Sequence, residues 1–541
     1  MSRVIFDHQP SAPQFDLGRA DVVCFVGLVR LLDPKPTLPI ALQGWLSALG
    51  YGGDQITQIT NVPVLLETYA AFTAIFDPGG SAKSRGTDYL AAAVRSFFAQ
   101  GGRRCYVVRV GDPVIPSDDT APTKDAADQR TPREIKRDAL LPSTLSVDNQ
   151  APSWTGIANL NALQDVSFLV VPDLPVLHAS KPQGAVGQIP SIPSGPEQFV
   201  ECSEADRTPK EALIYPPAAP RLSLSDYGAW ASTVASILNY LVSDSQMQQP
   251  EFREVQLVAA LPLPQDFDVA TAAENPSGAE LAQDVHDVIR AQMPEIVLPG
   301  DAVAPGNISS AFLQLAYPWL KTTGSNVLLE SLEPPDGALA GLLARNALTR
   351  GTFTSATKVQ PAEIYDVWPQ LPANETKSSA VPLAWDNATP KPLIERISLF
   401  GFTPDGLRLL SDVTAYPGES YRTAAVNRLV SVIRRAARHM GEAAIFENNG
   451  PRQWAQVQSL LQTLMTRLWN LNALDGATAR DAFSVRCDRT TMTQNDLDNG
   501  RLLAEVTFTA ASTIETIRVT LAMEASATSV QEISAIAAGV S

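Results

Sequence analysis

The residue types that carry out catalysis or bind metals are scarce in this sequence. It has four histidines and four cysteines in 541 residues, and no two cysteines form a CxxC pair. No HExxH pattern occurs, nor do the phosphate-binding patterns GxxxxGK(S/T) and GxGxxG or the GxSxG turn of serine hydrolases. The sequence therefore predicts no catalytic residue, no cofactor site and no metal site, and we expect that the protein is not an enzyme.

One acidic stretch, residues 496–500, is similar to the start of a calcium-binding loop. When Gly500 takes the sixth position of such a loop, the third position is Leu497 and the twelfth is Val506. Neither side chain can bind calcium, so the pattern fails at two ligands. Because Asn-Gly favours the left-handed backbone of a hairpin, we predict a tight turn between two strands here.

Composition limits the kinds of partner. The chain has 45% hydrophobic residues and is long enough for about three to four domains. Its formal net charge is −16, so it should not be attracted overall to nucleic acid or to an anionic membrane. Scattered cysteines favour a reducing compartment, and no signal peptide or membrane-spanning stretch is recognisable. We therefore expect a soluble protein that is assembled in the cytoplasm, without direct membrane insertion.

Apolar runs alternate with segments of helical periodicity through the first half of the chain. This alternation predicts an α/β fold. The predicted strands are residues 22–29, 105–110, 166–171 and 255–261, and the predicted helices are residues 87–100, 156–163 and 227–242.

The carboxyl third begins with two amphipathic patterns, which predict helices over residues 421–440 and 451–474. The first of them has five arginines and no acidic residue between Tyr421 and Gly441, which indicates a local basic surface. Two interpretations stay open: a solvated helix face, or a docking surface for an acidic partner. The arginines are Arg422, Arg428, Arg434, Arg435 and Arg438.

Both ends of the chain contain short strand-like segments. Near the amino terminus, Val4, Ile5 and Phe6 precede prolines that prevent a helix. Near the carboxyl terminus, residues alternate between apolar and polar or small over 517–523, which predicts an isolated strand with one apolar face. The apolar positions are Ile517, Val519, Leu521 and Met523.

An ordered set of segments resembles the contractile tail sheath proteins of phage tails and phage-tail-like injection systems. The sharpest segment is 485–502, which reads VRCDRTTMTQNDLDNGRL. The others are residues 87–110, 156–174, 317–319, 334–351 and 443–454. Because these segments span most of the chain in order, the resemblance is more specific than one short motif.

The resemblance implies a mixed α+β core domain formed by both chain ends, an inserted α/β middle domain and extended terminal arms. The boundaries that we predict are an arm at 1–20, the core at 21–110 and 391–510, the inserted domain at 111–390, and a terminal arm strand at 511–541. In this family the arms add strands to the sheets of neighbouring subunits. The arm residues implied here are Val4, Ile5, Phe6, Ile514, Ile517, Val519, Leu521 and Met523.

The resemblance also implies a function: a structural subunit that polymerises into a helical sheath around an inner tube and contracts to drive the tube through a target envelope. A phage-tail-like injection system is favoured, and the sheath of a phage tail is the alternative. A receptor-binding or adhesive surface module and a stand-alone α/β enzyme are alternatives from other classes.

The implied partners are further copies of the chain, an inner tube protein, and baseplate and terminal cap proteins, without a cofactor or nucleic acid. One of the two carboxyl-terminal helices should face the tube, and the candidate side chains are Arg428, Arg434, Arg435 and Arg438. The mature particle would be cytoplasmic, released from the cell or part of a virion.

Overall fold

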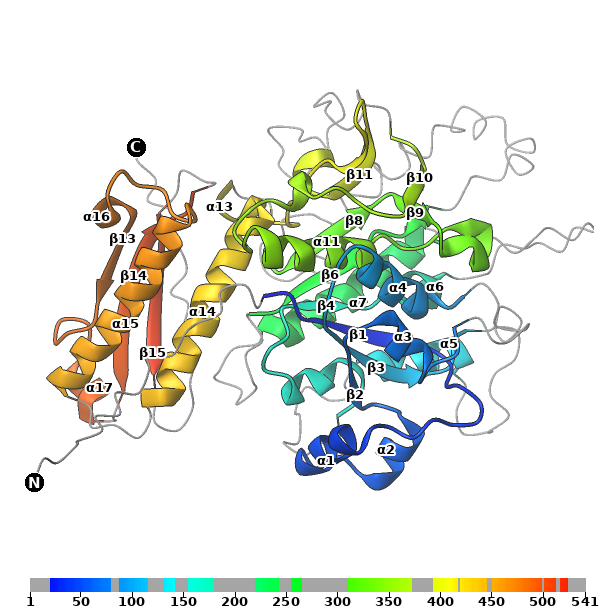
Figure 1. Ribbon diagram of the computed structural model, residues 1–541, viewed down its shortest axis with the longest axis horizontal. Coiled ribbons are helices and arrows are strands. Elements are labelled where there is room, and N and C mark those ends of the chain that lie inside the picture. Colours follow the sequence, from blue (N-terminus) through cyan, green and yellow to red (C-terminus); the bar gives the residue numbers. More distant parts are fainter. Residues whose placement is uncertain are drawn as a thin grey trace, which may run out of the picture.

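The chain folds into two modules, each with its own apolar core (Figure 1). The large module comprises the described residues from 20 to 416, and the C-terminal module comprises those from 424 to 523. The computed structural model describes residues 20–78, 87–114, 130–141, 154–179, 219–222, 224–242, 254–264, 310–371, 393–416, 419–444, 450–498, 501–511 and 516–523.

An eight-stranded sheet forms the centre of the large module, in the order β12-β11-β8-β6-β4-β1-β3-β2. The six inner strands are parallel, and β2 and β12 are antiparallel edge strands. The strands are β1 (Val23–Leu28), β2 (Pro63–Leu66), β3 (Cys105–Gly111), β4 (Phe168–Val170), β6 (Gln256–Ala260), β8 (Leu313–Tyr317), β11 (Ser398–Thr403) and β12 (Gly406–Leu409). All residues of β1 are buried, as expected for a central parallel strand covered on both faces. The α/β class and the strands predicted near 22–29, 105–110, 166–171 and 255–261 are confirmed.

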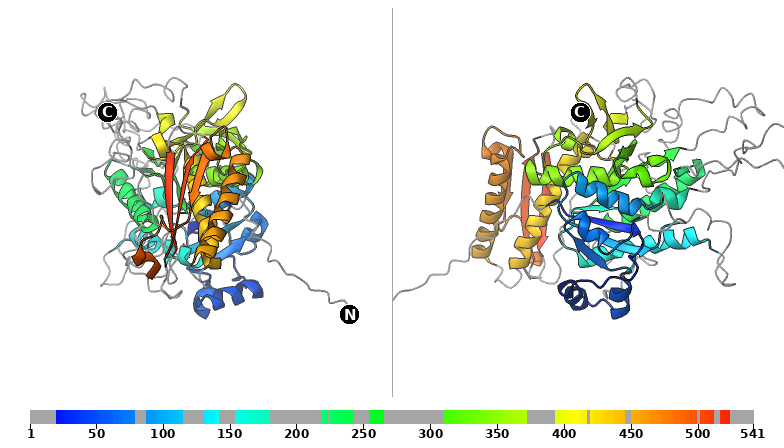
Figure 2. Two further views of the ribbon diagram at one scale, coloured as in Figure 1. Left: turned by 90° about the vertical axis from the view of Figure 1, so that its left-hand side faces the viewer. Right: turned by 45° about the vertical axis from the view of Figure 1, so that its right-hand side comes forward.

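Helices cover both faces of this sheet. α4 (Tyr89–Ala99) and α11 (Asp336–Thr349) lie side by side on one face, and α7 (Leu224–Val242) lies on the other (Figure 2). The predicted helices at 87–100 and 227–242 are confirmed, whereas 156–163 forms the 3-10 helix η3 (Gly156–Ala162). The module's remaining helices are α1 (Ile40–Ala48), α2 (Gly53–Gln58), α3 (Tyr69–Thr73), α5 (Pro132–Leu140), α6 (Leu174–His178), η6 (Ser325–Val327), η7 (Leu329–Ser331), η8 (Ala356–Lys358) and η9 (Leu393–Glu395). Two small sheets pair β9 (Trp319–Thr322) with β10 (Ile364–Trp368) and β5 (Arg221–Leu222) with β7 (Leu263–Pro264).

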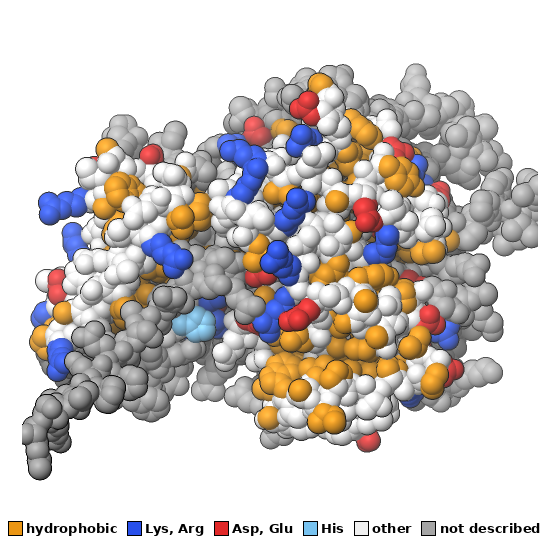
Figure 3. All heavy atoms as spheres, viewed as in Figure 1, with side chains coloured by type: hydrophobic (Ala, Val, Ile, Leu, Met, Phe, Trp, Pro, Cys, Tyr) orange, Lys and Arg blue, Asp and Glu red, His pale blue; other side chains and the backbone are white. Residues whose placement is uncertain are grey.

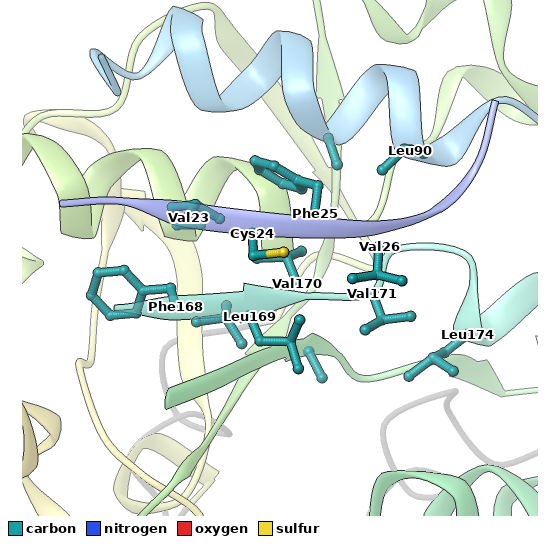
Figure 4. Packing of buried hydrophobic residues seen from close by; sticks show 14 of the residues in the cluster. Val23, Cys24, Phe25, Val26, Leu90, Phe168, Leu169, Val170, Val171 and Leu174 are labelled. Atoms are coloured by element: carbon teal, nitrogen blue, oxygen red, sulfur yellow. The ribbon is translucent and has the colours of Figure 1, made fainter. Parts of the chain in front are cut away.

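The pairing of β1 with β4 corrects the predicted domain boundary at residue 110. Val23 pairs with Phe168 and Phe25 with Val170, so the segments before and after this boundary belong to one sheet. In Figure 4, Phe25 points toward the helix that carries Leu90, and Cys24 lies on the opposite side of β1. The described sheet is thus continuous from β1 to β12, rather than split between a core and an inserted domain.

Two glycines allow α11 to lie directly against α4. A β-carbon built on Gly337 would be 2.4 Å from Cα of Ala93, and one built on Gly341 would be 2.6 Å from the carbonyl oxygen of Phe97. Since the two glycines are four residues apart, they share one helix face. The close approach of the two backbones therefore depends on the absence of side chains at both positions.

We expect Gly337→Ala to lower the free energy of unfolding by about 1–3 kcal/mol, because the added methyl group overlaps the backbone of α4. Gly228→Ala is the matched control in α7, since nothing lies within 4 Å of a β-carbon built there. The control should gain about 0.5–1 kcal/mol from helix propensity. Denaturant unfolding measures both effects, and equal stability of the two variants would disprove the tight contact.

The C-terminal module packs two long helices, α14 (Ala424–Ala444) and α15 (Pro451–Asn470), against a three-stranded antiparallel sheet. Its strands are β13 (Phe483–Arg486), β14 (Leu502–Thr509) and β15 (Thr516–Met523), and its short helices are α16 (Ala479–Ala482) and α17 (Gln494–Asp498). Along β14, Leu502, Ala504, Val506 and Phe508 are buried in alternation with partly exposed residues. The two long helices confirm the patterns at 421–440 and 451–474, and the short α13 (Glu419–Arg422) precedes them.

Candidate assembly site

The sheet of the C-terminal module ends in a strand whose outer side is open. Its strand order is β13-β14-β15, and β15 pairs with β14 from Leu502 opposite Met523 to Thr509 opposite Thr516. Within the described part of the chain, no strand pairs with the other side of β15. The predicted terminal strand therefore exists, but it is the edge of a sheet and not an isolated strand.

Four of the predicted arm residues lie in β15, each opposite a buried residue of β14. The paired positions are Ile517 with Phe508, Val519 with Val506, Leu521 with Ala504, and Met523 with Leu502. Val4, Ile5, Phe6 and Ile514 lie outside the described residues. The other edge strand, β13, already has one internal partner, since Nε2 of Gln458 donates to the carbonyl oxygen of Val485 at 3.1 Å. β15 is therefore the longer open edge, with eight residues against four in β13.

The arginines of α14 hold the two modules together. Arg428 makes a bidentate ion pair with Asp412, at 2.6 Å from Nη2 to Oδ2 and 3.0 Å from Nη1 to Oδ1. Its Nε also donates to the carbonyl oxygen of Thr352 at 3.1 Å. The side chains of Arg428 and Asp412 are 4% and 0% exposed. This is a buried, geometrically complete pair, which is the arrangement that desolvated charges need.

The electrostatics of Asp412 reflect this pairing. Burial by itself raises the pKa of Asp412, but the positive charge of Arg428 and hydrogen bonds from Arg428, Ala356 and Gln314 outweigh burial. The pKa of Asp412 therefore lies below its usual value. The carboxylate stays ionised at neutral pH and attracts Arg428 throughout that range.

A second contact between the modules involves Arg435 and Arg438. Nη2 of Arg438 lies 2.9 Å from Oε2 of Glu254, and Nε of Arg435 lies 3.5 Å from the same oxygen. Arg435 also donates to the carbonyl oxygen of Val166 at 2.8 Å, next to β4. These bonds join α14 to the segments that lead into two strands of the large sheet.

The structure supports neither of the two interpretations for the buried arginines of α14, which contact other parts of the same chain. Arg428 and Arg434 are 4% and 2% exposed, so the prediction of a basic surface is wrong for both. The acidic partner of Arg428, Arg435 and Arg438 belongs to the same chain. The buried guanidinium of Arg428 would have to leave its ion pair before it could reach an inner tube, so the tube-facing role of Arg428, Arg434, Arg435 and Arg438 stays a prediction. Sequence reasoning missed Asp412 and Glu254, because no local pattern connects a residue to partners that lie 16 and 181 positions away.

The described residues contain no group of three or more histidine, cysteine or acidic side chains that could hold a metal ion. His178 is buried in the core, where its ring nitrogens lie 2.9 Å from the carbonyl oxygen of Leu174 and 2.9 Å from Oγ1 of Thr233. Burial raises the pKa of the Cys24 thiol well above its ordinary value, so this thiol is not a reactive nucleophile. These side chains are parts of the core.

The stretch 496–500 also has a structural role. Asp496 lies in the short helix α17 (Gln494–Asp498), and its Oδ2 accepts a hydrogen bond from the backbone N–H of Thr493 at 2.8 Å. Oγ1 of Thr493 in turn accepts from the N–H of Asp496, which forms a capping box. A capped helix thus precedes β14, and Asn499 and Gly500, on which the predicted turn depends, lie outside the described residues.

No helix in the described parts of the chain is both long and apolar enough to cross a membrane.

Comparison with known proteins identifies this fold. No family model matches the sequence, and no curated protein does. A chain of the cryo-EM structure of the anti-feeding prophage (AFP) baseplate is 15% identical with a TM-score of 0.52, and the match covers 95% of this chain and 97% of that one. A chain of the same baseplate in its contracted state is 16% identical with a TM-score of 0.52, over 95% of both chains.

A third neighbour is a chain of the AFP helical sheath in its contracted state. It is 16% identical with a TM-score of 0.50, and the match covers 92% of this chain and 91% of that one. The likeness extends over nearly the whole of each chain and thus includes both modules. The chain therefore has the fold of the contractile tail sheath proteins that its sequence resembles.

Proposed function

We propose that this chain is the sheath subunit of a phage-tail-like contractile injection system. It polymerises into a helix around an inner tube and contracts to drive the tube through a target envelope. The observation that carries this proposal is the shared fold with a chain of the AFP helical sheath over more than nine-tenths of each chain. The sheath of a phage tail is the second candidate, because it would use the same fold.

Strand addition at β15 would join the subunits. The outer side of this strand presents N–H and C=O groups that no described strand pairs with, and such an edge accepts a further strand. Residues 4–6 of a neighbouring copy are the proposed added strand. Because the added strand comes from another copy, each subunit would stay connected to the next while the lattice rearranges.

The energy for contraction would be stored in the contacts between subunits. Head-to-tail contacts whose rotation does not close produce a helical polymer. A metastable extended lattice can then repack into one of lower free energy without nucleotide hydrolysis. The buried Arg428–Asp412 pair supports this proposal, since it fastens the C-terminal sheet to the large module and lets force pass between them. Inner tube, baseplate and terminal cap proteins are the proposed partners, in a particle assembled in the cytoplasm.

Negative-stain electron microscopy of the purified protein, with sedimentation to measure the polymer fraction, tests the proposed function. We expect hollow, regular tubes. If the particles stay dispersed at high concentration and with an inner tube protein added, the proposal is wrong.

Proline substitutions in the amino-terminal segment test strand addition. Val4→Pro combined with Phe6→Pro should reduce the sedimenting polymer more than tenfold, because proline cannot donate to a strand ladder. The matched control, Val4→Thr with Phe6→Thr, keeps the N–H groups and should polymerise. Circular dichroism should show both variants folded, since the described core begins at residue 20. Equal polymerisation of the two variants would rule out residues 4–6 as the joining strand.

A further inference from the structure

Exposed basic side chains gather where α4 and α11 end. We call Arg103, Arg345, Arg350 and Lys358 the basic row, and all four are exposed. Figure 3 shows Lys and Arg side chains following one another down this face, near the boundary between the two modules. Two of them, Arg345 and Arg350, belong to the segment 334–351 that contributed to the family resemblance.

The surrounding structure holds the basic row in place. The stem of Arg345 crosses Gly101, where a β-carbon would lie 2.9 Å from Cδ of Arg345 and where φ is +99°. Beyond Arg350, the carbonyl oxygens of Thr352 and Thr354 accept from Arg428. The backbone N–H of Ala356, two residues before Lys358, donates to Asp412 at 2.8 Å. A ligand that binds these cations therefore orders little backbone, which lowers the entropic cost of binding.

No described carboxylate lies within ion-pair distance of any member of the basic row. Neighbouring arginines differ in this respect. Arg95 lies 3.3 Å from Glu363, and Arg104 lies 3.5 Å from Asp165. The basic row is thus a set of positive charges that the described part of the subunit leaves uncompensated.

The distribution of charge along the chain indicates where the complementary charge lies. The described residues contain 29 basic and 29 acidic side chains, so they carry no net charge. The entire net charge of −16 belongs to the remaining residues. One segment, 265–309, contains eight acidic residues and one arginine. Every copy of this chain therefore supplies both a basic row and an excess of carboxylates.

We propose that the basic row is a docking surface for acidic side chains of a second copy of this chain. The proposal rests on the proposed function, because a helical polymer repeats each contact between copies along its length. A head-to-tail contact joins two different parts of identical subunits, and basic side chains of one copy with acidic side chains of the next form such a pair. It also offsets the repulsion between copies that each carry −16.

Charge reversal tests this docking surface on the purified full-length protein. Arg103→Glu, Arg345→Glu and Arg350→Glu together should raise the critical concentration for polymerisation about tenfold at 0.15 M salt, as expected for several exposed ion pairs. The matched control, Lys35→Glu, Arg452→Glu and Arg480→Glu, changes the net charge equally at exposed positions elsewhere and should polymerise as wild type does. The conservative variant Arg345→Lys with Arg350→Lys should also polymerise.

Three outcomes would overturn the proposal. The first is equal critical concentrations for the reversal and control variants. The second is a lowered thermal midpoint of the unpolymerised reversal variant with unchanged polymerisation, which would place the acidic partner within the same subunit. The third is a defect that occurs only when an inner tube protein is added, which would assign the basic row to that protein. If wild type forms no tubes, the proposed function fails; if all variants form them equally, only the docking surface fails.

Discussion

Replacing Arg428 by alanine should lower the free energy of unfolding by about 3–5 kcal/mol, the largest effect that we expect from a single substitution. The variant leaves Asp412 without its counter-ion, and the Asp412 side chain is 0% exposed. Water cannot replace the lost guanidinium at that depth, and the remaining donors are neutral groups from Ala356 and Gln314. The carboxylate must then stay charged without compensation or take up a proton.

The position of the Arg428–Asp412 pair predicts which part of the protein loses stability first. Arg428 lies on α14 and Asp412 lies in the large module, so the contact between the modules should weaken before either core does. Limited proteolysis should cut the chain near residue 416 faster than in wild type, and denaturant unfolding should show two transitions. We also expect fewer tubes, because the C-terminal sheet is then poorly fixed to its subunit.

Two controls separate this effect from a general loss of arginine. Arg422 pairs with Glu395 at 2.9 Å, but the two side chains are 30% and 34% exposed, so Arg422→Ala should cost no more than about 1 kcal/mol. Arg428→Met with Asp412→Leu removes both charges and should be more stable than Arg428→Ala alone. Equal losses for Arg422→Ala and Arg428→Ala would contradict the role of burial.

Local sequence patterns predicted the elements of this fold well, because those patterns arise from burial of the elements themselves. The apolar run of β1 reflects a strand covered on both faces, and the stripe of α15 reflects one helix face on a core. The pairing between strands has no such pattern. Nothing within residues 23–28 indicates that β4, about 140 positions later, is their neighbour, so the sequence alone predicts a domain boundary at residue 110.

The assembly site was predictable to a lesser extent for the same reason. Alternation over 517–523 predicted a strand, but alternation does not identify the strand with which it pairs, and the partner is β14 of the same chain. The spacing of the arginines in α14 is compatible with a helix face in water and equally with a helix face that packs on a second module. Burial of Arg428 depends on Asp412, which lies outside the helix. The residues of the basic row come from three segments of the chain, so only the folded structure shows that they lie close together.

Three buried carboxyl groups should make the large module sensitive to alkaline pH. They are Asp173, which accepts from the N–H of Leu28 at 2.7 Å; Glu333, which accepts from the hydroxyl groups of Ser96 and Thr322; and Asp336, which accepts from the N–H of Gly337 at 2.8 Å. Burial raises the pKa of Asp173 to about 8, and it raises the pKa values of Glu333 and Asp336 to about 7. The nearby Asp88 also raises the pKa of Asp173.

The sign of the effect follows from the protons bound in each state. Unfolded carboxyl groups lose their protons near pH 4, whereas these three keep theirs in the folded state until about pH 7 to 8. The folded state therefore binds more protons between these limits, and the free energy of unfolding falls as pH rises through this window. The stabilisation that the three protonated carboxyl groups provide is complete below about pH 4 and is lost above about pH 8. Since each pKa unit corresponds to about 1.4 kcal/mol, Asp173 alone accounts for a fall on the order of 5 kcal/mol.

Asp173→Asn should remove much of this dependence. The amide oxygen can still accept from the N–H of Leu28, and an amide does not ionise, so the variant resembles the protonated acid. We expect the variant to match wild type near pH 4.5 and to exceed it by several kcal/mol at pH 9, in unfolding measured across this range. Asp54→Asn, at an exposed position of α2, is the control and should leave the pH profile unchanged. If the profile of Asp173→Asn runs parallel to that of wild type, Asp173 is not protonated in the folded subunit, and the alkaline loss has another origin.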